Sequence, residues 1–286
     1  MNTGEEKWDV VVSANRSSLS LRLNETWRYR DLLFLFVRRD FVATYKQTIL
    51  GPIWFFLQPL LTALIFTLVF GRIAKLPVDG FPRILFYLSG ITAWNYFADC
   101  MVKTSSTFIA NANLFSKVYF PRIIVPFSII VSNIMRFGIQ LLLLFSFIIY
   151  YNCMSISVIP NVYVLLFPLL LIIMAGLGLG LGILISSMTT KYRDLQFLVA
   201  FGVSLMMYMS PVIFPLNTLH EGLMRHVILA NPMTAVIEVF RYSFLGGKGE
   251  FILWWPLVYS TGFMLVTLII GLGMFNRVQR SFMDNV

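Results

Sequence analysis

Three charged residues interrupt long apolar stretches of the sequence, and their types and spacing could support ion pairing or proton transfer. Asp99 and Lys103 are four residues apart, a spacing that places them on one face of a helix, and Arg136 lies in the middle of the next apolar stretch. A charge at the centre of a lipid bilayer costs about 2.5–3.5 kcal/mol on insertion scales, so it needs a partner or water. We expect Asp99 and Lys103 to form an ion pair rather than a proton relay, and Arg136 to face a carboxylate or a carbonyl of another helix.

Other residues that could carry chemistry are sparse. Glu238 and Arg241 are three residues apart and could pair on one helix face. The side chains that could bind a metal or form a disulfide are His220, His226, Cys100 and Cys153. Two histidines in one loop are too few for a metal site, and two distant cysteines do not indicate a disulfide framework. We therefore predict no metal site and no catalytic residue.

The sequence also contains no motif for binding ATP. A phosphate-binding loop has the pattern G-x-x-x-x-G-K-[ST], whereas GGKG at 246–249 is not followed by Ser or Thr and lacks the upstream glycine. Neither H-E-x-x-H, nor a paired-cysteine motif, nor a nucleophile elbow occurs. We expect this chain to bind no cofactor. A membrane-embedded transferase is an alternative, although few carboxylates are placed to serve one.

The composition indicates that lipid is the main solvent of this chain. Its 286 residues are 58% hydrophobic and 12% charged, whereas a soluble domain carries about 25% charged residues. A helix that crosses the roughly 30 Å hydrocarbon layer needs about 20 residues. We predict an all-α membrane protein with a transmembrane domain over 51–276. Its six predicted transmembrane helices lie near 52–71, 84–104, 122–151, 162–189, 195–216 and 251–276.

Lysine and arginine residues are unevenly distributed among the segments that join these spans. Most of them share a side of the membrane with both termini, so both termini, including the tail at 277–286, should be cytoplasmic. The net charge of +9 then reflects membrane orientation and contact with anionic membrane lipids. Nucleic-acid binding is a poor alternative, because the basic residues form no stripe on a folded domain.

The segment before the first span has the charge pattern of an amphipathic helix. After a polar N-terminal lead over 1–26, residues 27–50 place Arg38, Arg39 and Lys46 on one face of a predicted helix, opposite large apolar residues. This helix is too charged to span a membrane, so we expect it to lie in the headgroup plane. The alternative is a helix docked on the protein itself.

Between the last two predicted spans, residues 217–248 are neither fully apolar nor typical of a soluble loop. Asn231-Pro232 predicts a turn between two helical pieces that are too short to cross a membrane. We expect a re-entrant segment, whose half-helices dip into the membrane and return, with protein or water covering their backbone. A surface hairpin is the alternative. In the fourth span, GLGLGLG at 176–182 predicts close helix packing.

The connection between the second and third spans, residues 108–121, combines helix-capping, apolar and basic residues. The chain there reads NANLFSKVYFPRIIVP (111–126), in which an asparagine can cap a short helix and two prolines limit its length. Its apolar residues are Leu114, Phe115, Val118, Tyr119 and Phe120, and its charged residues are Lys117 and Arg122. We expect the aromatic side chains to be exposed to the cytoplasm, and exposed rings of this kind indicate a protein partner.

Aromatic side chains are abundant in the first, second and fifth predicted spans. Ring faces can stack on the C–H faces of sugars, and tyrosine and tryptophan also form hydrogen bonds at one end. The candidates for a sugar-binding surface are Trp54, Phe55, Tyr87, Trp94, Tyr96, Phe97 and Tyr208. The alternative is that these rings form interfacial belts or pack against lipid.

Four stretches together resemble the permease subunit of bacterial polysaccharide exporters of the ABC transporter superfamily. They are YRDLLFLFVRRDFVATYKQTILGPIWFFLQP, FYLSGITAWNYF, NANLFSKVYFPRIIVP and NPMTAVIEVFRYSFLG, and they follow one another in the family's order from about residue 27 onward. The O-antigen export branch is the most similar, and the permeases for capsular polysaccharide and teichoic acid are related.

The resemblance implies a homodimer in the bacterial inner membrane that pairs with two copies of a separate ATPase subunit, which would bind ATP and Mg²⁺. The two protomers would form a channel for a lipid-linked polysaccharide, lined by aromatic residues. Residues 108–121 would form a coupling segment that contacts the ATPase subunit through Asn113, Leu114, Phe115, Ser116, Lys117, Tyr119, Phe120 and Arg122. The re-entrant segment would include Asn231, Pro232, Glu238 and Arg241.

Three other functions fit parts of the pattern. A permease for small lipophilic drugs would belong to the same superfamily. A membrane-embedded transferase would depend on Asp99 and Glu238. A secondary transporter would work on an ion gradient, but such proteins show internal repeats with paired interrupted helices, and this sequence has one irregular segment.

Overall fold

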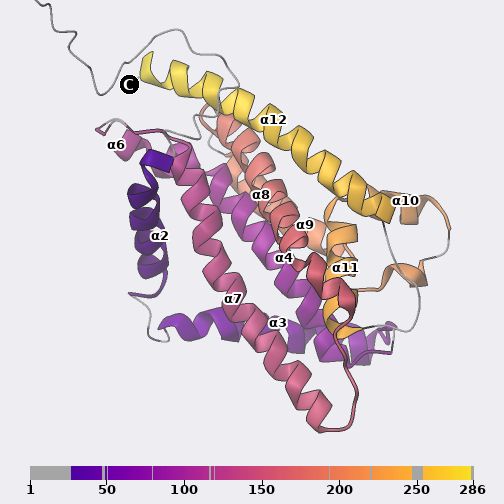
Figure 1. Cartoon of the computed structure of the whole chain (residues 1–286). Helices are drawn as coiled ribbons and strands as arrows, with labels where there is room; N and C mark the ends of the chain where they lie inside the picture. Colours follow the sequence, from indigo (N-terminus) through magenta and orange to yellow (C-terminus); the bar gives the residue numbers. More distant parts are fainter. Residues whose placement is uncertain are drawn as a thin grey trace, which may run out of the picture.

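The computed structural model describes residues 27–46, 49, 51–78, 80–115, 117–118, 120–192, 194–219, 221–246 and 254–284. Throughout these ranges the regular structure is helical, which confirms the predicted all-α class (Figure 1). Several predictions concern residues outside these ranges: the N-terminal lead over 1–26, Ser116 and Tyr119 of the coupling segment, and the start of the last span at 251–253.

One helix, α4 (Arg83–Ser105), forms the centre of the molecule. It is buried along most of its length and packs against α8 (Phe167–Thr189), α7 (Ile124–Cys153), α11 (Met233–Leu245) and α3 (Trp54–Phe66) (Figure 1). Because its buried residues lie on every face, other helices have to surround it.

Glycines hold α8 close to α4 on one face and to α12 (Trp254–Asp284) on the other. A Cβ atom at Gly180 would lie 2.9 Å from the backbone nitrogen of Leu268 in α12. A Cβ atom at Gly182 would lie 2.6 Å from the Cβ of Thr104 in α4. Positions two apart on a helix are about 200° apart, so alternate glycines face different neighbours. The close packing predicted from GLGLGLG is confirmed.

By length and composition, four segments in the described part of the chain can cross a membrane: Gly51–Ile73, Ile124–Cys153, Val162–Thr189 and Trp254–Gln279. The predicted second span is the long helix α4, which carries three charged residues and is not among them. The predicted fifth span contains only the 14-residue helix α9 (Leu195–Tyr208), after which the chain turns. The described residues therefore support four spans, or five if one bent helix pair counts as a span. The number six stays a prediction.

The predicted turn at Asn231-Pro232 joins that bent pair, α10 (Leu223–Ala230) and α11, whose axes meet at 85°. The Asn231 side chain accepts a hydrogen bond from a backbone N–H at the start of α11. Nearly every residue of α11 is buried, and the hydroxyl of Ser260 in α12 donates to the Pro232 carbonyl at 2.6 Å. Protein thus covers the backbone at the bend, which is the condition for a broken helix at membrane depth. Entry of this pair into the membrane stays a prediction.

The helix predicted before the first span is present as α2 (Arg30–Tyr45), and it lies beside α7. Phe36 and Val37 are buried against the protein, whereas the three basic candidates are exposed: Arg38, Arg39 and Lys46. One face of α2 is therefore docked on the protein itself, which is the alternative weighed for this helix. Its position in the headgroup plane stays a prediction.

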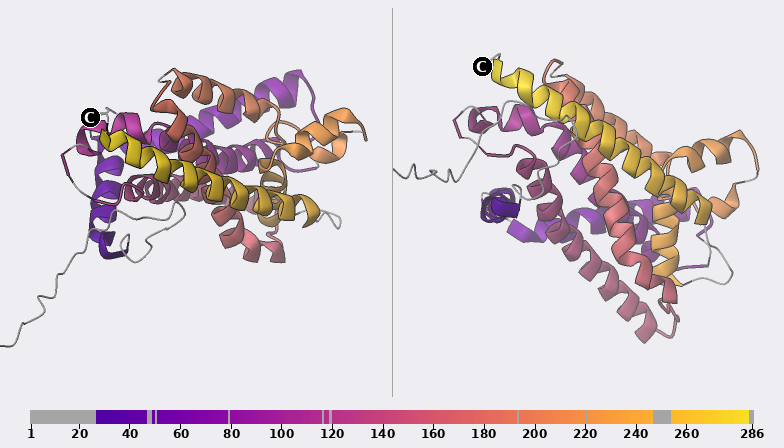
Figure 2. Two further views of the ribbon diagram at one scale, coloured as in Figure 1. Left: turned by 90° about the horizontal axis from the view of Figure 1, so that it is seen from above. Right: turned by 45° about the horizontal axis from the view of Figure 1, so that its top comes forward.

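Short helices gather at one end of the molecule. The coupling segment contains α5 (Thr107–Ala110) and α6 (Ala112–Phe115), which lie at the same end as the C-terminal part of α12 (Figures 1 and 2). The turn between α8 and α9 also reaches this end, where the Thr189 hydroxyl donates to the Ser105 carbonyl at 3.0 Å. Three parts of the chain that are predicted to be cytoplasmic thus lie at the same end of the molecule: the coupling segment, the turn between α8 and α9, and the C-terminal part of α12.

Candidate functional site: the coupling segment and the ion pairs

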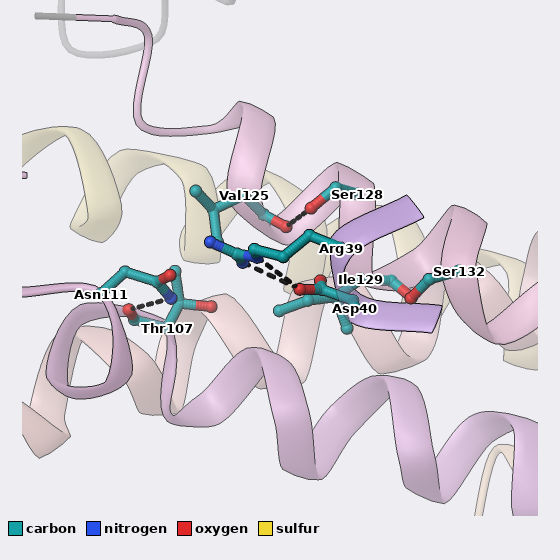
Figure 3. Close-up of polar contacts among 8 residues, drawn as sticks. All are labelled: Arg39, Asp40, Thr107, Asn111, Val125, Ser128, Ile129 and Ser132. Carbon is teal, nitrogen blue, oxygen red and sulfur yellow. Dashed lines mark hydrogen bonds and ion pairs between the residues drawn. The ribbon is translucent and has the colours of Figure 1, made fainter. Parts of the chain in front are cut away.

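The coupling segment consists of two single helical turns that meet at Asn111. The side-chain amide of Asn111 donates to the Thr107 carbonyl at 3.0 Å, closing the first turn (Figure 3). Its backbone carbonyl accepts hydrogen bonds from the N–H groups of Leu114 and Phe115 at 3.0 Å each, which starts the second turn. The helical piece ends at Phe115, and α7 begins at Ile124, just after Pro121. The segment is therefore as short as the sequence predicts.

The prediction that the aromatic side chains of this segment are exposed is wrong for Phe115 and Phe120, each of which is 6% exposed. Their ring centroids lie 5.8 Å apart, and the Phe120 ring lies 5.7 Å from that of Phe36 in α2. The Phe108 ring is fully buried, 4.7 Å from the Phe275 ring of α12. The rings are buried because α2 and α12 both reach this end of the molecule and cover them.

The described residues that the segment leaves exposed are a mixture of polar and apolar ones, Ala110 among them. Asn113 and Lys117 are exposed, and Val118 is 54% exposed. Leu114 is half-buried. A protein that docks here would contact these exposed residues. The buried phenylalanines would support them without touching the partner.

Arg122 faces inward, although it is a candidate partner contact. The residue is 5% exposed, and its Nη1 donates to the backbone carbonyl of Gln279 in α12 at 3.2 Å. Its guanidinium carbon also lies over the Phe115 ring, 5.3 Å from the centroid. Burial lowers the pKa of the Arg122 guanidinium from its usual value, but arginine remains protonated in proteins. The contact with α12 is therefore a charge-assisted hydrogen bond.

Two charged residues of α2, Arg39 and Asp40, lie close to the start of α7 (Figure 3). Arg39 forms an ion pair with its neighbour Asp40, with 2.8 Å between Nη2 and Oδ1, and its guanidinium carbon lies 4.7 Å from the Phe36 ring centroid. On the facing turns of α7, the hydroxyls of Ser128 and Ser132 donate to carbonyls of their own helix. These small, internally satisfied side chains allow α2 to pack against α7 without leaving buried donors unpaired.

Arg136 of α7 faces the carboxylate of another helix, as expected. Its Nη1 lies 3.7 Å from Oδ2 of Asp99 in α4, and the Nζ of Lys103 lies 3.7 Å from the same oxygen. Lys103 also donates to Oδ1 of Asn133 at 2.8 Å. The guanidinium carbon of Arg136 lies 5.0 Å from the ring centroid of Phe55 in α3. The predicted pair of Asp99 with Lys103 is confirmed, as part of a cluster that joins α3, α4 and α7.

Glu238 and Arg241 form the predicted pair on α11, and the pair is buried. Nη1 of Arg241 lies 3.0 Å from Oε1 of Glu238, and the side chains are 2% and 7% exposed, in that order. Nη2 of Arg241 donates to the Pro211 carbonyl at 2.6 Å, and the guanidinium carbon lies 3.8 Å from the Phe86 ring centroid. Gly90 makes room for it, because a Cβ there would lie 2.9 Å from Nη2. This arrangement ties α11 to α4 and to the chain that follows α9.

The structure places the seven candidate aromatic residues in two groups. Four rings of α4 are at most 3% exposed and pack between helices: Tyr87, Trp94, Tyr96 and Phe97. The other three lie nearer the surface, with Trp54 45% exposed, Tyr208 51% exposed and Phe55 half-buried. The Tyr208 ring centroid lies 6.4 Å from that of Phe66 in α3. A sugar chain could reach only the second group in this conformation.

Several residues of these sites were not singled out by the sequence. Phe108 and Phe275 lie in apolar surroundings that do not distinguish them from other phenylalanines, and they meet only through the fold. Gly90 carried a weak signal, because an isolated glycine within a helix often marks a close approach. In the described part of the chain, no three His, Cys, Asp or Glu side chains are grouped so that they could hold a metal ion.

Comparisons with known proteins identify relatives of this chain and its family. Two O-antigen export system permease proteins RfbA from Klebsiella pneumoniae are each 27% identical to this chain over 270 residues, which cover 93% of this chain and 99% of the relative. An O-antigen export system permease protein RfbA from Myxococcus xanthus is 29% identical over 223 residues, covering 78% of this chain and 83% of the relative. A family model described as ABC-2 type transporter matches residues 31–245, a range that begins in α2 and ends with α11. This chain belongs to the ABC-2 type transporter family of membrane proteins.

Proposed function

We propose that this chain is the permease of an ATP-driven exporter that moves a lipid-linked polysaccharide of the O-antigen type across the bacterial inner membrane. The observation that carries the proposal is the similarity, over 93% of this chain, to relatives named as O-antigen export permeases. The sequence contains no phosphate-binding loop, so ATP and Mg²⁺ would bind to a separate ATPase subunit. The working complex would contain two copies of this chain and two copies of that subunit.

Both termini and the coupling segment would face the cytoplasm. Exposed basic residues at the end of the molecule that holds this segment support this orientation: Lys117, Lys191 and Arg277. The exposed basic residues of α2 would contact anionic lipid headgroups there, while its apolar face stays docked on α7.

The ATPase subunit would dock on the exposed part of the coupling segment. Asn113, Lys117 and Val118 are accessible and supply polar, charged and apolar contact. Phe115, Phe120 and Arg122 are buried, so they would support the docking surface rather than touch the partner. Force from ATP binding would enter the membrane domain through this segment, because it is covalently continuous with α4 and α7.

The polysaccharide would pass along the exposed faces of α3 and α9, at the contact between two copies of this chain. Trp54 and Tyr208 present ring surface on these helices, and Phe55 adds part of its ring. Aromatic surface can stack on sugar rings without fixing one sugar sequence, which suits a moving polymer. The buried pair of Glu238 and Arg241 would hold the bent helices α10 and α11 against α4 on the opposite side from the coupling segment.

Deletion of the chain tests the proposal in the cell. We expect the deletion strain to lose surface display of the polymer while lipid-linked polymer accumulates inside, and a plasmid copy to restore display. Antibody labelling of intact and permeabilised cells measures the two pools. Display of polymer at the normal level without this chain would contradict the proposal. Loss of dye efflux with normal polymer display would favour a drug exporter instead.

A further inference from the structure

We infer that Arg122 and Phe275 are positioning residues that clamp the coupling segment to α12, so that any displacement of the segment moves α12 together with α4 and α7. The inference rests on the proposed function, because a partner ATPase supplies the displacement. It adds a second route for that displacement, one that does not follow the covalent chain.

The first contact of the clamp joins residues that are 157 positions apart in the sequence. Nη1 of Arg122 donates to the carbonyl of Gln279 at 3.2 Å, and Arg122 is 5% exposed. The same guanidinium covers the Phe115 ring, at 5.3 Å from its centroid. One side chain therefore holds both the end of α6 and the last turns of α12. A charge-assisted hydrogen bond that is shielded from water is stronger than an exposed one.

The second contact of the clamp is between the aromatic rings of Phe108 and Phe275. The rings of Phe108 and Phe275 are fully buried, with centroids 4.7 Å apart and planes tilted by 30°. The backbone N–H of Phe108 also donates to the hydroxyl of Ser186 in α8 at 3.4 Å. The start of the coupling segment is thus fixed to α12 and α8 by contacts that water does not reach.

These contacts matter because α12 has no covalent link to the coupling segment. The segment continues directly into α4 on one side and α7 on the other, so those helices follow it in any case. Among the described residues, the clamp joins the segment to α12 directly, whereas α8 and α11 join it to α12 through their own packing. On α8, Gly180 packs directly against α12, since a Cβ at Gly180 would lie 2.9 Å from the backbone nitrogen of Leu268. Movement passed to α12 would therefore reach α8 as well.

A set of Arg122 variants in the reconstituted complex of this chain and its ATPase subunit tests the clamp. Arg122→Met removes the donor and keeps most of the apolar stem, and Arg122→Lys keeps a charged donor. We expect Arg122→Met to keep ATP hydrolysis but to export about tenfold less polymer per ATP, as expected for loss of a charged hydrogen bond. Arg122→Lys should recover at least half of the loss. Phe275→Leu should lower the same ratio about threefold, through the lost ring contact.

The control is Arg277→Met, which removes the same charge from the same helix at an exposed position. We expect it to export at the wild-type ratio. A wild-type ratio in Arg122→Met would overturn the clamp and leave the proposed function standing. Absence of ATP-dependent export by the wild-type complex would instead contradict the proposed function.

A distance measurement tests the clamp without relying on a destabilised variant. Spin labels are placed at Ala110→Cys and Arg277→Cys, both exposed, in a Cys153→Ser background, and the native Cys100 is fully buried. We expect the distance between the labels to stay the same when the complex binds a non-hydrolysable ATP analogue, because the segment and α12 move together. A shift in this distance would overturn the clamp.

Discussion

Arg241 is the largest side chain that is fully buried in the described part of the chain, and its surroundings illustrate how this fold accommodates charge. A buried guanidinium loses its hydration and is stable only with a carboxylate and hydrogen-bond acceptors around it. Glu238, the Pro211 carbonyl and the Phe86 ring supply these contacts within 3.8 Å. Gly90 provides the space. The pair thus fixes one relative position of α4 and α11.

Removal of one partner of this pair should be much worse than removal of both. We expect Arg241→Met to lower the free energy of unfolding by about 3–5 kcal/mol, because it leaves the Glu238 carboxylate buried without its cation. The double variant Glu238→Leu, Arg241→Met should recover most of that loss, since two apolar groups of similar size need no partner. Unfolding of the purified protein in detergent, followed as a function of denaturant, measures the difference.

The control for this pair is Arg72→Met, at an exposed arginine, which should change stability by less than about 0.5 kcal/mol. If the double variant were as unstable as the sum of the two single variants, the two side chains would not be coupled and our interpretation of the pair would be wrong.

At this scale the sequence predicted pairs within one helix better than pairs between helices. Asp99 with Lys103 and Glu238 with Arg241 follow from helix geometry alone, because residues three or four apart lie on one face. The partner of Arg136 could be predicted only as a carboxylate or carbonyl, and the partner of Arg122 was missed. Contacts between helices depend on how the helices are rotated and shifted against each other, which local spacing does not encode.

At the scale of elements, α8 is held between two helices by alternate glycines. Gly176 and Gly180 face α12, and Gly178 and Gly182 face α4. In lipid the hydrophobic effect does not drive helices together, so close backbone approach provides much of the attraction. The contact between α8 and its neighbours should therefore be sensitive to a single added methyl group.

Gly180→Ala should destabilise the protein more than Gly202→Ala. At Gly180 the new Cβ would lie 2.9–3.0 Å from atoms of Thr267 and Leu268, including backbone, so the helices must separate, at a cost of about 1–3 kcal/mol. At Gly202 in α9 nothing lies within 4 Å, so alanine should be neutral or stabilising by up to about 1 kcal/mol. Thermal unfolding in detergent measures both. Equal midpoints for the two variants would show that α8 and α12 have room to adjust.

The sequence predicted the existence of the helices better than their extent and surroundings. The apolar stretch at 195–216 continues beyond the helix, because the largely exposed α9 ends at Tyr208 and the chain then turns and is mostly buried within the protein over 210–216. A long apolar stretch is expected both for a helix that faces lipid and for a segment that is buried in protein. The length of the stretch alone therefore could not distinguish these two cases. For the same reason, two aromatic residues of the coupling segment that were expected on the surface are buried: Phe120 packs against Phe36 of α2, and Phe115 packs against Phe108 and Phe120.

For the whole molecule, the two ends bring together different parts of the chain. One end gathers the coupling segment, the turn between α8 and α9 and the C-terminal part of α12, which carry exposed basic residues (Figures 1 and 2). The other end contains the C-terminal end of α7 and the bent pair of α10 and α11. In our proposal the first end receives the ATPase subunit, and the second faces the outside of the inner membrane.

The native cysteines allow this orientation to be tested. Cys153 is exposed at the end of α7, whereas Cys100 is buried. We expect a membrane-impermeant maleimide to label Cys153 in spheroplasts but not in sealed inverted vesicles. In a Cys153→Ser background, Arg277→Cys should show the opposite behaviour, and the background alone should not be labelled. Labelling of Cys153 from the cytoplasmic side would mean that the orientation is inverted.

Movement of polymer across the membrane can be measured directly in inverted vesicles, whose cytoplasmic face is outward. Vesicles that contain this chain, its ATPase subunit and lipid-linked polysaccharide are given ATP, and an added glycosidase then digests any polymer left outside. We predict that ATP protects the polymer by moving it into the vesicle lumen, and that ADP, or omission of this chain, leaves it digestible. Protection without ATP, or protection driven by an ion gradient alone, would contradict ATP-driven export, and so would digestion of all polymer in the presence of ATP.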